Sequence, residues 1–250
     1  RYVNHCIWPH VRRLEDASST SARKALIQYA RTAFANRRSL VWPAQEVGLE
    51  RLVNNDSFVF CAPTGTGKTT VATLAIVQQL FLDNTQPGML DQGDHSDNLV
   101  LYVVPTRALA AEVEARLSKD LAGVSAEPVL VTGLYGGIDW GPTDAWLQSD
   151  RPTVVVCTFE KADALLRYLG SLFLHRVRMV IIDEAHEVEL HSDRSTDLQQ
   201  GTSRSLRLEQ LGSRLFRGRD TYGFRVVGLS AVASSAAPAL GRWIASEDEQ

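Results

Sequence analysis

The sequence predicts an α/β fold with a doubly wound parallel sheet and helices on both faces, and three observations favour it. Six short runs rich in Val and Ile are apolar at successive positions, as strands covered on both faces are. Helix-like stretches lie between most of these runs, and this alternation is typical of parallel sheets. A Gly-rich turn joins the first run to the helix after it. Because ligands bind beyond the carboxyl ends of the strands in such sheets, the functional residues are expected there.

The elements follow in a regular order along the chain. The expected strands cover residues 57–61, 99–104, 129–132, 153–157, 179–182 and 225–229. The expected helices cover residues 68–82, 107–121, 160–169, 206–215 and 237–244, and an amphipathic helix over 22–34 comes before them all. We therefore divide the chain into a helical lead-in segment, residues 1–38, and one sheet-containing domain, residues 39–250.

The composition is that of a folded protein. Of the 250 residues 44% are hydrophobic and 22% charged, which excludes a disordered chain. The net charge of −3, from 26 basic and 29 acidic residues, disfavours a small basic protein that coats nucleic acid by bulk charge. No apolar run is long enough to predict a membrane-spanning helix, so no membrane contact is expected. The chain begins without Met or a signal peptide, so we interpret it as a piece of a longer protein.

The three cysteines are Cys6, Cys61 and Cys157. They are widely spaced, and the last two lie in apolar, strand-like runs. This pattern predicts buried thiols rather than a disulfide, and a reducing compartment, cytoplasmic or nuclear.

The Gly-rich turn carries the first functional motif. Residues 62–69, here called the phosphate loop, fit the pattern G-x-x-x-x-G-K-[ST] with Ala62 at the first Gly. The glycines let several backbone N–H groups point inward, and the helix N-terminus adds its partial positive charge. The ammonium of Lys68 is expected to reach the outer phosphates, and the Thr69 hydroxyl to ligate Mg²⁺. The residues expected to bind the nucleotide in this region are Thr64, Gly65, Thr66, Gly67, Lys68, Thr69 and Thr70.

A pair of carboxylates follows the fifth expected strand. The apolar run 179–182 leads directly into Asp183-Glu184-Ala185-His186, here called the acidic box. An apolar strand that ends in two carboxylates is the Walker B arrangement. Asp183 is expected to hold Mg²⁺, and Glu184 to polarise the attacking water in a phosphoryl-transfer reaction.

With both motifs identified, the sequence resembles the superfamily 2 helicases of the DExH-box type. The resemblance covers about residues 39–246. Further motifs carry it: 105–110 resembles motif Ia, 158–161 the T-x-E-K form of motif Ib, 229–232 motif III, and 42–45 the P-x-Q segment. Details of these motifs resemble the Ski-like branch. The resemblance implies a RecA-like P-loop NTPase domain that hydrolyses ATP with Mg²⁺ to move on DNA or RNA.

The resemblance also implies roles for individual residues. Gln45 would read the adenine edge, and His186 would bridge the nucleotide and nucleic-acid sites; with Lys68, Asp183 and Glu184, His186 completes the expected catalytic set. Motif III would couple hydrolysis to movement through Ser230 and Ala231. The residues expected to bind nucleic-acid phosphates, at two helix starts, are Thr106, Arg107, Thr158 and Lys161.

Two departures from the family pattern keep alternatives open. Val232 replaces the usual Thr of motif III, and no second RecA-like domain with its Q-x-x-G-R-x-x-R arginines occurs in the chain, which we expect to stop just before that domain. The alternatives are an ATP-binding switch or scaffold, and a motor on duplex DNA in a defence or restriction complex without strand separation. The segments 82–98 and 189–205 look like insertions and are expected to bind protein partners.

Overall fold

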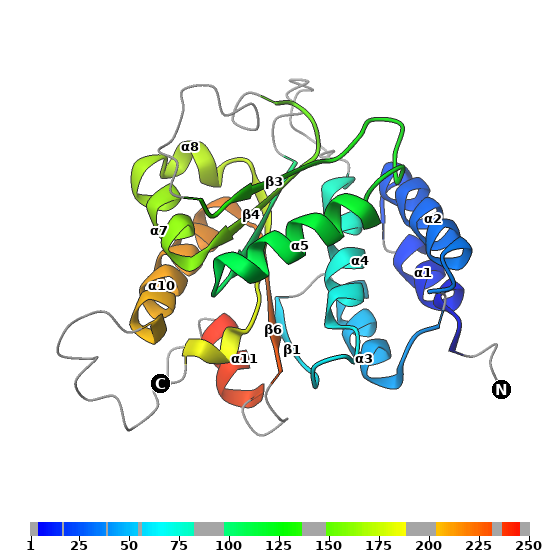
Figure 1. Cartoon of the computed structure of the whole chain (residues 1–250), viewed down its shortest axis with the longest axis horizontal. Coiled ribbons are helices and arrows are strands. Elements are labelled where there is room, and N and C mark those ends of the chain that lie inside the picture. Colours follow the sequence, from blue (N-terminus) through cyan, green and yellow to red (C-terminus); the bar gives the residue numbers. More distant parts are fainter. Residues whose placement is uncertain are drawn as a thin grey trace.

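A six-stranded parallel sheet runs through the centre of the molecule, as the sequence predicts (Figure 1). The computed structural model describes residues 5–16, 18–38, 40–54, 57–82, 98–136, 149–188, 204–231 and 237–245. The strand order is β1-β6-β5-β2-β4-β3. The strands are β1 (Phe58–Cys61), β2 (Leu99–Val104), β3 (Leu130–Leu134), β4 (Thr153–Thr158), β5 (Val177–Ile182) and β6 (Arg225–Ser230).

Helices cover both faces of this sheet. One layer consists of α1 (Ile7–Asp16), α2 (Thr20–Ala35), α3 (Pro43–Val53), α4 (Lys68–Leu80) and α5 (Arg107–Asp120). The other consists of α7 (Phe159–Tyr168), α8 (Ser171–Leu174), α10 (Arg204–Tyr222) and α11 (Ala237–Ala245), and a 3₁₀ turn, η3 (Ala185–Val188), follows β5. Within the described ranges, no helix is both long and apolar enough to cross a membrane.

The core is divided in two by the sheet because successive strand residues point to opposite faces. In β2, Val100, Tyr102 and Val104 pack in the cluster with α4 and α5, whereas the residues between them pack with α7 and α10. All six residues of β2 are buried. Burial on both faces explains why β2 is an unbroken apolar run in the sequence. The alternation of its side chains determines which of them contact each helix layer.

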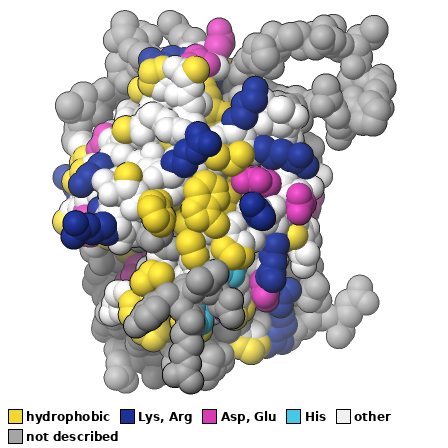
Figure 2. Space-filling view, turned by 90° about the vertical axis from the view of Figure 1, so that its right-hand side faces the viewer, with side chains coloured by type: hydrophobic (Ala, Val, Ile, Leu, Met, Phe, Trp, Pro, Cys, Tyr) yellow, Lys and Arg dark blue, Asp and Glu magenta, His cyan; other side chains and the backbone are white. Residues whose placement is uncertain are grey.

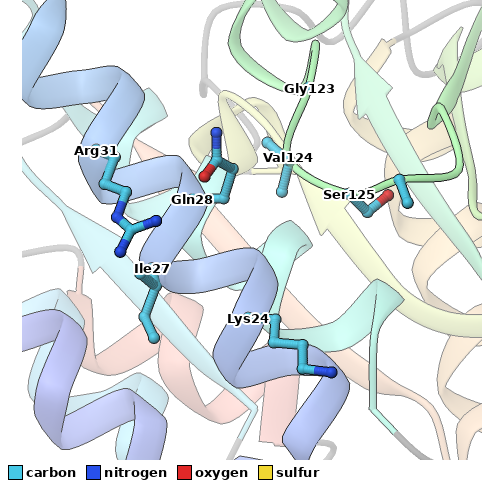
Figure 3. A pocket seen from close by; sticks show the side chains of 8 residues that line it. Lys24, Ile27, Gln28, Arg31, Gly123, Val124 and Ser125 are labelled. Atoms are coloured by element: carbon cyan, nitrogen blue, oxygen red, sulfur yellow. The ribbon is translucent and has the colours of Figure 1, made fainter.

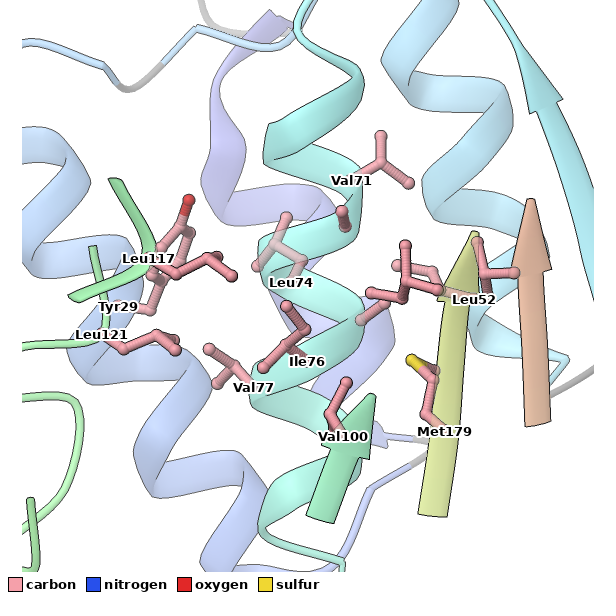
Figure 4. Close-up of a cluster of buried hydrophobic side chains, with 14 of the residues drawn as sticks. Tyr29, Leu52, Val71, Leu74, Ile76, Val77, Val100, Leu117, Leu121 and Met179 are labelled. Atoms are coloured by element: carbon pink, nitrogen blue, oxygen red, sulfur yellow. The ribbon is translucent and has the colours of Figure 1, made fainter. Parts of the chain in front are cut away.

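Helix α4, which follows the phosphate loop, is the most enclosed helix in its layer. All its residues from Val71 to Leu80 are buried. Figure 4 shows α4 between Tyr29 of α2 and Leu117 of α5 on one side, and Val100 of β2 and Met179 of β5 on the other. The start of α4 is therefore held rigidly relative to the strand ends.

The lead-in helix predicted over 22–34 is confirmed as α2, whose buried face includes Ala25, Leu26 and Tyr29. The helix α2 packs on α4. Two hydrogen bonds join the residues just before α2 to the end of α4: the Ser19 Oγ donates to the Phe81 carbonyl at 2.8 Å, and the Gln78 Nε2 donates to the Ser18 Oγ at 3.3 Å. The sequence did not predict α1 or α3. Both pack in the same layer: α3 contacts α4, and α1 packs on α2 and α3.

The outer face of α1 and α2 is basic. Residues 5–38 contain seven Lys and Arg against Glu15 and Asp16, although the whole chain has a net charge of −3. Figure 2 views the molecule from this side and shows hydrophobic side chains near the middle of the face with Lys and Arg around them. Positive charge is thus concentrated on the layer that carries the lead-in helices.

Candidate active site

The phosphate loop turns sharply between β1 and α4 through two glycines in the left-handed region. Gly65 has φ +81° and Gly67 has φ +83°. Gly67 is the N-cap of α4, and a Cβ atom there would collide with the Nε2 of Gln45. The backbone angle therefore favours glycine at position 67, and a larger residue there would also displace the Gln45 amide. The loop is further closed by the Thr66 Oγ1, which donates to the Pro63 carbonyl at 2.6 Å.

The other predicted loop residues lie around this turn. Thr64 and Gly65 are exposed, whereas Lys68, Thr69 and Thr70 are partly buried in the first turn of α4. The Thr69 carbonyl accepts from the Thr73 Oγ1 at 2.8 Å. This contact does not involve the Thr69 hydroxyl. The first turn of α4 therefore lies directly beside the phosphate loop, as is typical of a helix N-terminus that binds an anion.

Gln45 connects α3 to the phosphate loop. Its side chain is 3% exposed. The Oε1 accepts from the Trp42 N–H at 2.8 Å, and the Nε2 donates to the Gly67 carbonyl at 3.1 Å. Both ends of the amide are thus engaged within the protein, and the expected contact with adenine stays a prediction. What the sequence did not reveal is this direct connection between α3 and the loop.

The acidic box lies beside the phosphate loop. The strand β5 that carries it is separated from β1 only by β6, which pairs with both. The Nζ of Lys68 lies 3.7 Å from the Oε1 of Glu184, and these side chains are 11% and 25% exposed. Glu184 has φ +52°, an uncommon backbone conformation for a residue other than Gly. Such local strain is found most often at functional sites.

Two polar atoms of this pair are buried without a hydrogen-bond partner. They are the Nζ of Lys68 and the Oε2 of Glu184. Buried polar atoms normally have a partner, because the loss of hydration is otherwise uncompensated. A cationic donor at the start of a helix and a carboxylate 3.7 Å from it fit a bound phosphate and a polarised water molecule. The donor set therefore fits a nucleoside triphosphate.

Asp183 is the more deeply buried carboxylate, at 9% exposure. Its Oδ2 accepts from the Tyr102 hydroxyl at 2.9 Å, and its Oδ1 accepts from the Glu184 N–H at 2.9 Å. Burial raises the pKa of Asp183, while the hydrogen bond from Tyr102 acts in the opposite direction. Tyr102 was not predicted as a site residue; the available signal was one hydroxyl in an otherwise apolar strand, since a buried tyrosine usually has a hydrogen-bond partner.

His186 and Ser230 join the acidic box to the end of β6. The His186 Nδ1 lies 3.2 Å from the Ser230 Oγ and 3.2 Å from the Glu184 Oε2, the latter without hydrogen-bond geometry. The Ser230 carbonyl accepts from the Ala62 N–H at 3.0 Å. The Ser230 hydroxyl lies beside the His186 ring, and Ala231 follows it, partly buried.

The four residues expected to bind nucleic acid lie at two neighbouring strand ends. β2 and β4 are paired, and the last pair in their register is Val104 with Thr158. Thr106 caps α5 by accepting from the Leu109 N–H at 3.2 Å, and Arg107 is the exposed first residue of that helix. Thr158 is buried, and Lys161 is partly buried in the first turn of α7. The structure brings these two helix starts to the same edge of the sheet.

Some predicted features fall outside the described residues. They are Val232 and most of the two expected partner segments, residues 83–97 and 189–203.

A hollow elsewhere on the surface is not this site. It lies between α2 and the turn after α5, and Figure 3 shows Lys24 and Arg31 beside it with Gly123 and Val124 across from them. The residues that line it belong to α2 and to the turn after α5, and none of them belongs to the phosphate loop or the acidic box.

The chain matches a protein-family model over residues 42–238, that of the DEAD/DEAH box helicases. Among curated proteins it is 33% identical over 204 residues to the DExH-box ATP-dependent RNA helicase DExH12 of Arabidopsis thaliana, covering 81% of this chain and 8% of that protein. It is 32% identical over 199 residues to the RQC trigger complex helicase SLH1 of Saccharomyces cerevisiae, covering 78% of this chain and 9% of that protein. The chain thus spans less than a tenth of the length of these relatives.

Solved structures show the same fold. The helicase Lhr of Mycobacterium smegmatis, bound to single-stranded DNA and AMP-PNP, superposes with a TM-score of 0.65 at 23% identity, over 93% of this chain and 27% of that one. The DEAD-box helicase Mss116, bound to single-stranded RNA and UDP-BeF, superposes with a TM-score of 0.62 at 20% identity, over 91% of this chain and 41% of that one. The sheet described above is therefore a RecA-like fold.

Proposed function

Since the chain belongs to the DEAD/DEAH box helicase family, we propose that it is the ATP-binding part of an ATP-dependent helicase or translocase that moves on DNA or RNA. The observation that carries this proposal is the meeting of the phosphate loop and the acidic box, with the Lys68 Nζ buried, without a hydrogen-bond partner, and 3.7 Å from the Oε1 of Glu184. Both curated relatives described above are helicases by name.

Each residue of the site has a separate role in the proposed hydrolysis of ATP. Lys68 and the N–H groups of the phosphate loop would bind the β- and γ-phosphates, with Thr69 and Asp183 holding Mg²⁺ and Glu184 orienting the attacking water. Bound Mg²⁺ supplies positive charge next to the phosphate oxygens. His186, 3.2 Å from both Glu184 and Ser230, would relay the state of the site to the end of β6.

Replacing Lys68 by alanine tests the nucleotide site. We expect the affinity for MgATP to fall by about 10-fold to 100-fold, because a hydrogen bond to a charged group contributes about 1.5–3 kcal/mol. Calorimetric titration with AMP-PNP and Mg²⁺ measures the affinity. Lys119→Ala, an exposed lysine near the end of α5, is the matched control and is expected to bind like the wild type. Unchanged affinity in Lys68→Ala would show that the loop is not the phosphate site.

Nucleic acid would lie across the starts of α5 and α7, at the edge formed by the ends of β2 and β4. A helix N-terminus attracts phosphates, and Arg107 adds an exposed positive charge at the first of them. Backbone contacts of this kind hold a strand without reading its bases, which is what a motor needs in order to move along it.

Arg107→Ala is expected to weaken the binding of single-stranded oligonucleotides about equally for all sequences. The loss of one phosphate contact should lower the slope of log affinity against log salt by about one. Fluorescence anisotropy with several oligonucleotides over a range of salt concentrations measures both quantities. Arg12→Ala, an exposed arginine on α1, serves as the control. A loss confined to one base sequence would mean that Arg107 reads bases instead.

Two further parts of the proposal concern partners. A second RecA-like domain, C-terminal to these residues, would supply the arginines that complete the site, and protein partners would bind the segments 82–98 and 189–205. The chain is further proposed to work in a reducing compartment, cytoplasmic or nuclear, because the wide spacing of its three cysteines favours thiols over a disulfide. The ATP-dependent switch and the duplex-DNA motor remain the alternative functions, and a strand-displacement assay distinguishes both from a helicase.

A further inference from the structure

Within the strands that the structure describes, one tyrosine hydroxyl lies inside the sheet, next to the acidic box. Tyr102 is the fourth residue of β2, between β5 and β4, and its exposed fraction is 0%. Its neighbours along the strand are Leu and Val, which bring no polar atom to the core. A buried hydroxyl needs a partner, and this one donates to the Oδ2 of Asp183 at 2.9 Å. The hydroxyl therefore points at one oxygen of one carboxylate.

The second oxygen of that carboxylate is held from the other side. The Oδ1 of Asp183 accepts from the N–H of Glu184, also at 2.9 Å. This contact accompanies the left-handed backbone of Glu184, φ +52°. The Asp183 N–H in turn donates to the Val103 carbonyl at 2.8 Å, so the backbone of Asp183 is joined to the residue that follows Tyr102. With one donor on each oxygen, the carboxylate has its plane fixed.

We propose that Tyr102 is a positioning residue of the magnesium site: its hydroxyl fixes the orientation of the Asp183 carboxylate for metal binding. The inference rests on the proposed function, in which Asp183 holds Mg²⁺. The χ2 angle of an aspartate is broad and about two-fold, so an unconstrained carboxylate samples many orientations. A metal ligand that is oriented before binding loses less conformational freedom when the metal binds, and groups that hold ligands in this way tune metal affinity strongly.

Packing alone does not account for the tyrosine. Tyr102 shares its cluster with Val100, Val104 and Val154, and a phenylalanine would fill the same space without a hydroxyl to satisfy. The Tyr102 hydroxyl has the Asp183 Oδ2 as its partner at 2.9 Å, so the tyrosine adds one specific contact to the acidic box that a phenylalanine would lack.

Tyr102→Phe removes this one oxygen atom and tests the inference. AMP-PNP is titrated calorimetrically at a series of Mg²⁺ concentrations and again in EDTA, and thermal unfolding is followed by circular dichroism. We expect the Mg²⁺ concentration for half-maximal nucleotide binding to rise about 10-fold to 100-fold, the usual effect of losing a group that orients a metal ligand. Binding of the metal-free nucleotide in EDTA should not change, because Lys68 and the phosphate loop are intact.

Tyr135→Phe is the matched control. The Tyr135 hydroxyl donates to the Oε2 of Glu114 at 2.5 Å, so this variant also separates a tyrosine from a carboxylate, but away from the acidic box. Its Mg²⁺ requirement is expected to equal that of the wild type. Equal Mg²⁺ requirements for Tyr102→Phe and the wild type would overturn the inference. Unfolding of Tyr102→Phe, or an equal loss of affinity with and without Mg²⁺, would also overturn it, because the hydroxyl would then serve the fold.

A third variant separates this inference from the proposed function. Asp183→Asn removes the ligand itself and is expected to raise the Mg²⁺ requirement at least as far as Tyr102→Phe. If Asp183→Asn leaves the requirement unchanged, Asp183 does not hold the metal, and the proposed magnesium site is wrong together with the inference. If Asp183→Asn raises the requirement and Tyr102→Phe does not, the magnesium site stands and only the role of Tyr102 is wrong.

Discussion

Glu184→Gln is expected to leave the affinity for MgATP close to that of the wild type and to slow hydrolysis by about 10²-fold or more, the usual contribution of a general base. The reason lies in the arrangement of the Glu184 side chain. Its Oε1 is 3.7 Å from the Lys68 Nζ, and its Oε2 has no hydrogen-bond partner. A carboxylate oxygen can accept a proton from the attacking water, whereas the amide of glutamine cannot. Single-turnover hydrolysis and AMP-PNP titration measure the two quantities separately.

Glu187→Gln provides the matched control for this variant. Glu187 lies in η3, the 3₁₀ turn that directly follows Glu184, and its N–H donates to the Glu184 carbonyl at 2.9 Å. This variant therefore makes the same change of charge within one turn of Glu184, but it keeps the Glu184 carboxylate beside Lys68. We expect hydrolysis by Glu187→Gln to stay close to wild type. Equal slowing in both variants would mean that local charge, and not a general base, explains the effect of Glu184.

The second large effect concerns the missing arginines. Alone, the 250-residue chain is expected to bind adenine nucleotide but to hydrolyse it slowly and to separate no strands. Charge develops on the γ-phosphate oxygens in the transition state, and only Lys68, Mg²⁺ and backbone N–H groups would meet it here. A facing domain with arginine fingers is expected to raise turnover by ~10³-fold or more. No Q-x-x-G-R-x-x-R sequence occurs within the 250 residues.

The measurement compares three samples in ATPase and strand-displacement assays. They are the chain alone, the chain joined to a second RecA-like domain that carries the Q-x-x-G-R-x-x-R arginines, and the joined protein with those arginines replaced. The third sample is the control for simple stabilisation by the added domain. Rapid turnover stimulated by nucleic acid in the chain alone would contradict the prediction. The catalytic arginine would then come from these residues or from a second copy of the chain.

The strands were the easiest part of the fold to predict, because burial on both faces leaves a clear mark in the sequence. β2 and β4 are buried at every residue and appear as continuous apolar runs. β3 lies at the edge of the sheet with half-buried residues, and there the predicted strand, 129–132, ended before the observed one, Leu130–Leu134. Where burial is partial, the hydrophobic pattern no longer marks the end of a strand.

The helices were harder to predict where contacts with other elements, and not helical periodicity, determine which residue occupies a position. α10 extends over Arg204–Tyr222, although the predicted helix covered only 206–215. Two glycines inside it, Gly212 and Gly218, allow close approach of Trp243 and Leu174, which no sequence pattern reveals. α3 begins with Trp42 as N-cap and Pro43 in its first turn, and the single strong signal there, Gln45, was interpreted only as a ligand-binding residue.

The positions of the phosphate loop and the acidic box were predictable because each motif follows a recognisable strand. The contacts between elements were not. The Tyr102–Asp183 hydrogen bond joins residues 81 positions apart, and the Gln45–Gly67 hydrogen bond joins residues 22 apart. Both depend on which strands and helices become neighbours in space, and the order of elements along the chain does not fix that.

The enclosed position of α4 has a practical consequence for where a truncated version of this protein can begin. The family match begins at residue 42, but α1 and α2 end before it and supply one wall of the core around α4. A truncated chain starting at residue 42 would expose apolar side chains such as Leu74 and Val77 to water, on the helix whose first turn carries Lys68. We therefore expect the minimal family segment to aggregate when it is expressed, and a chain that keeps α2, with α1 packed on it, to stay in solution.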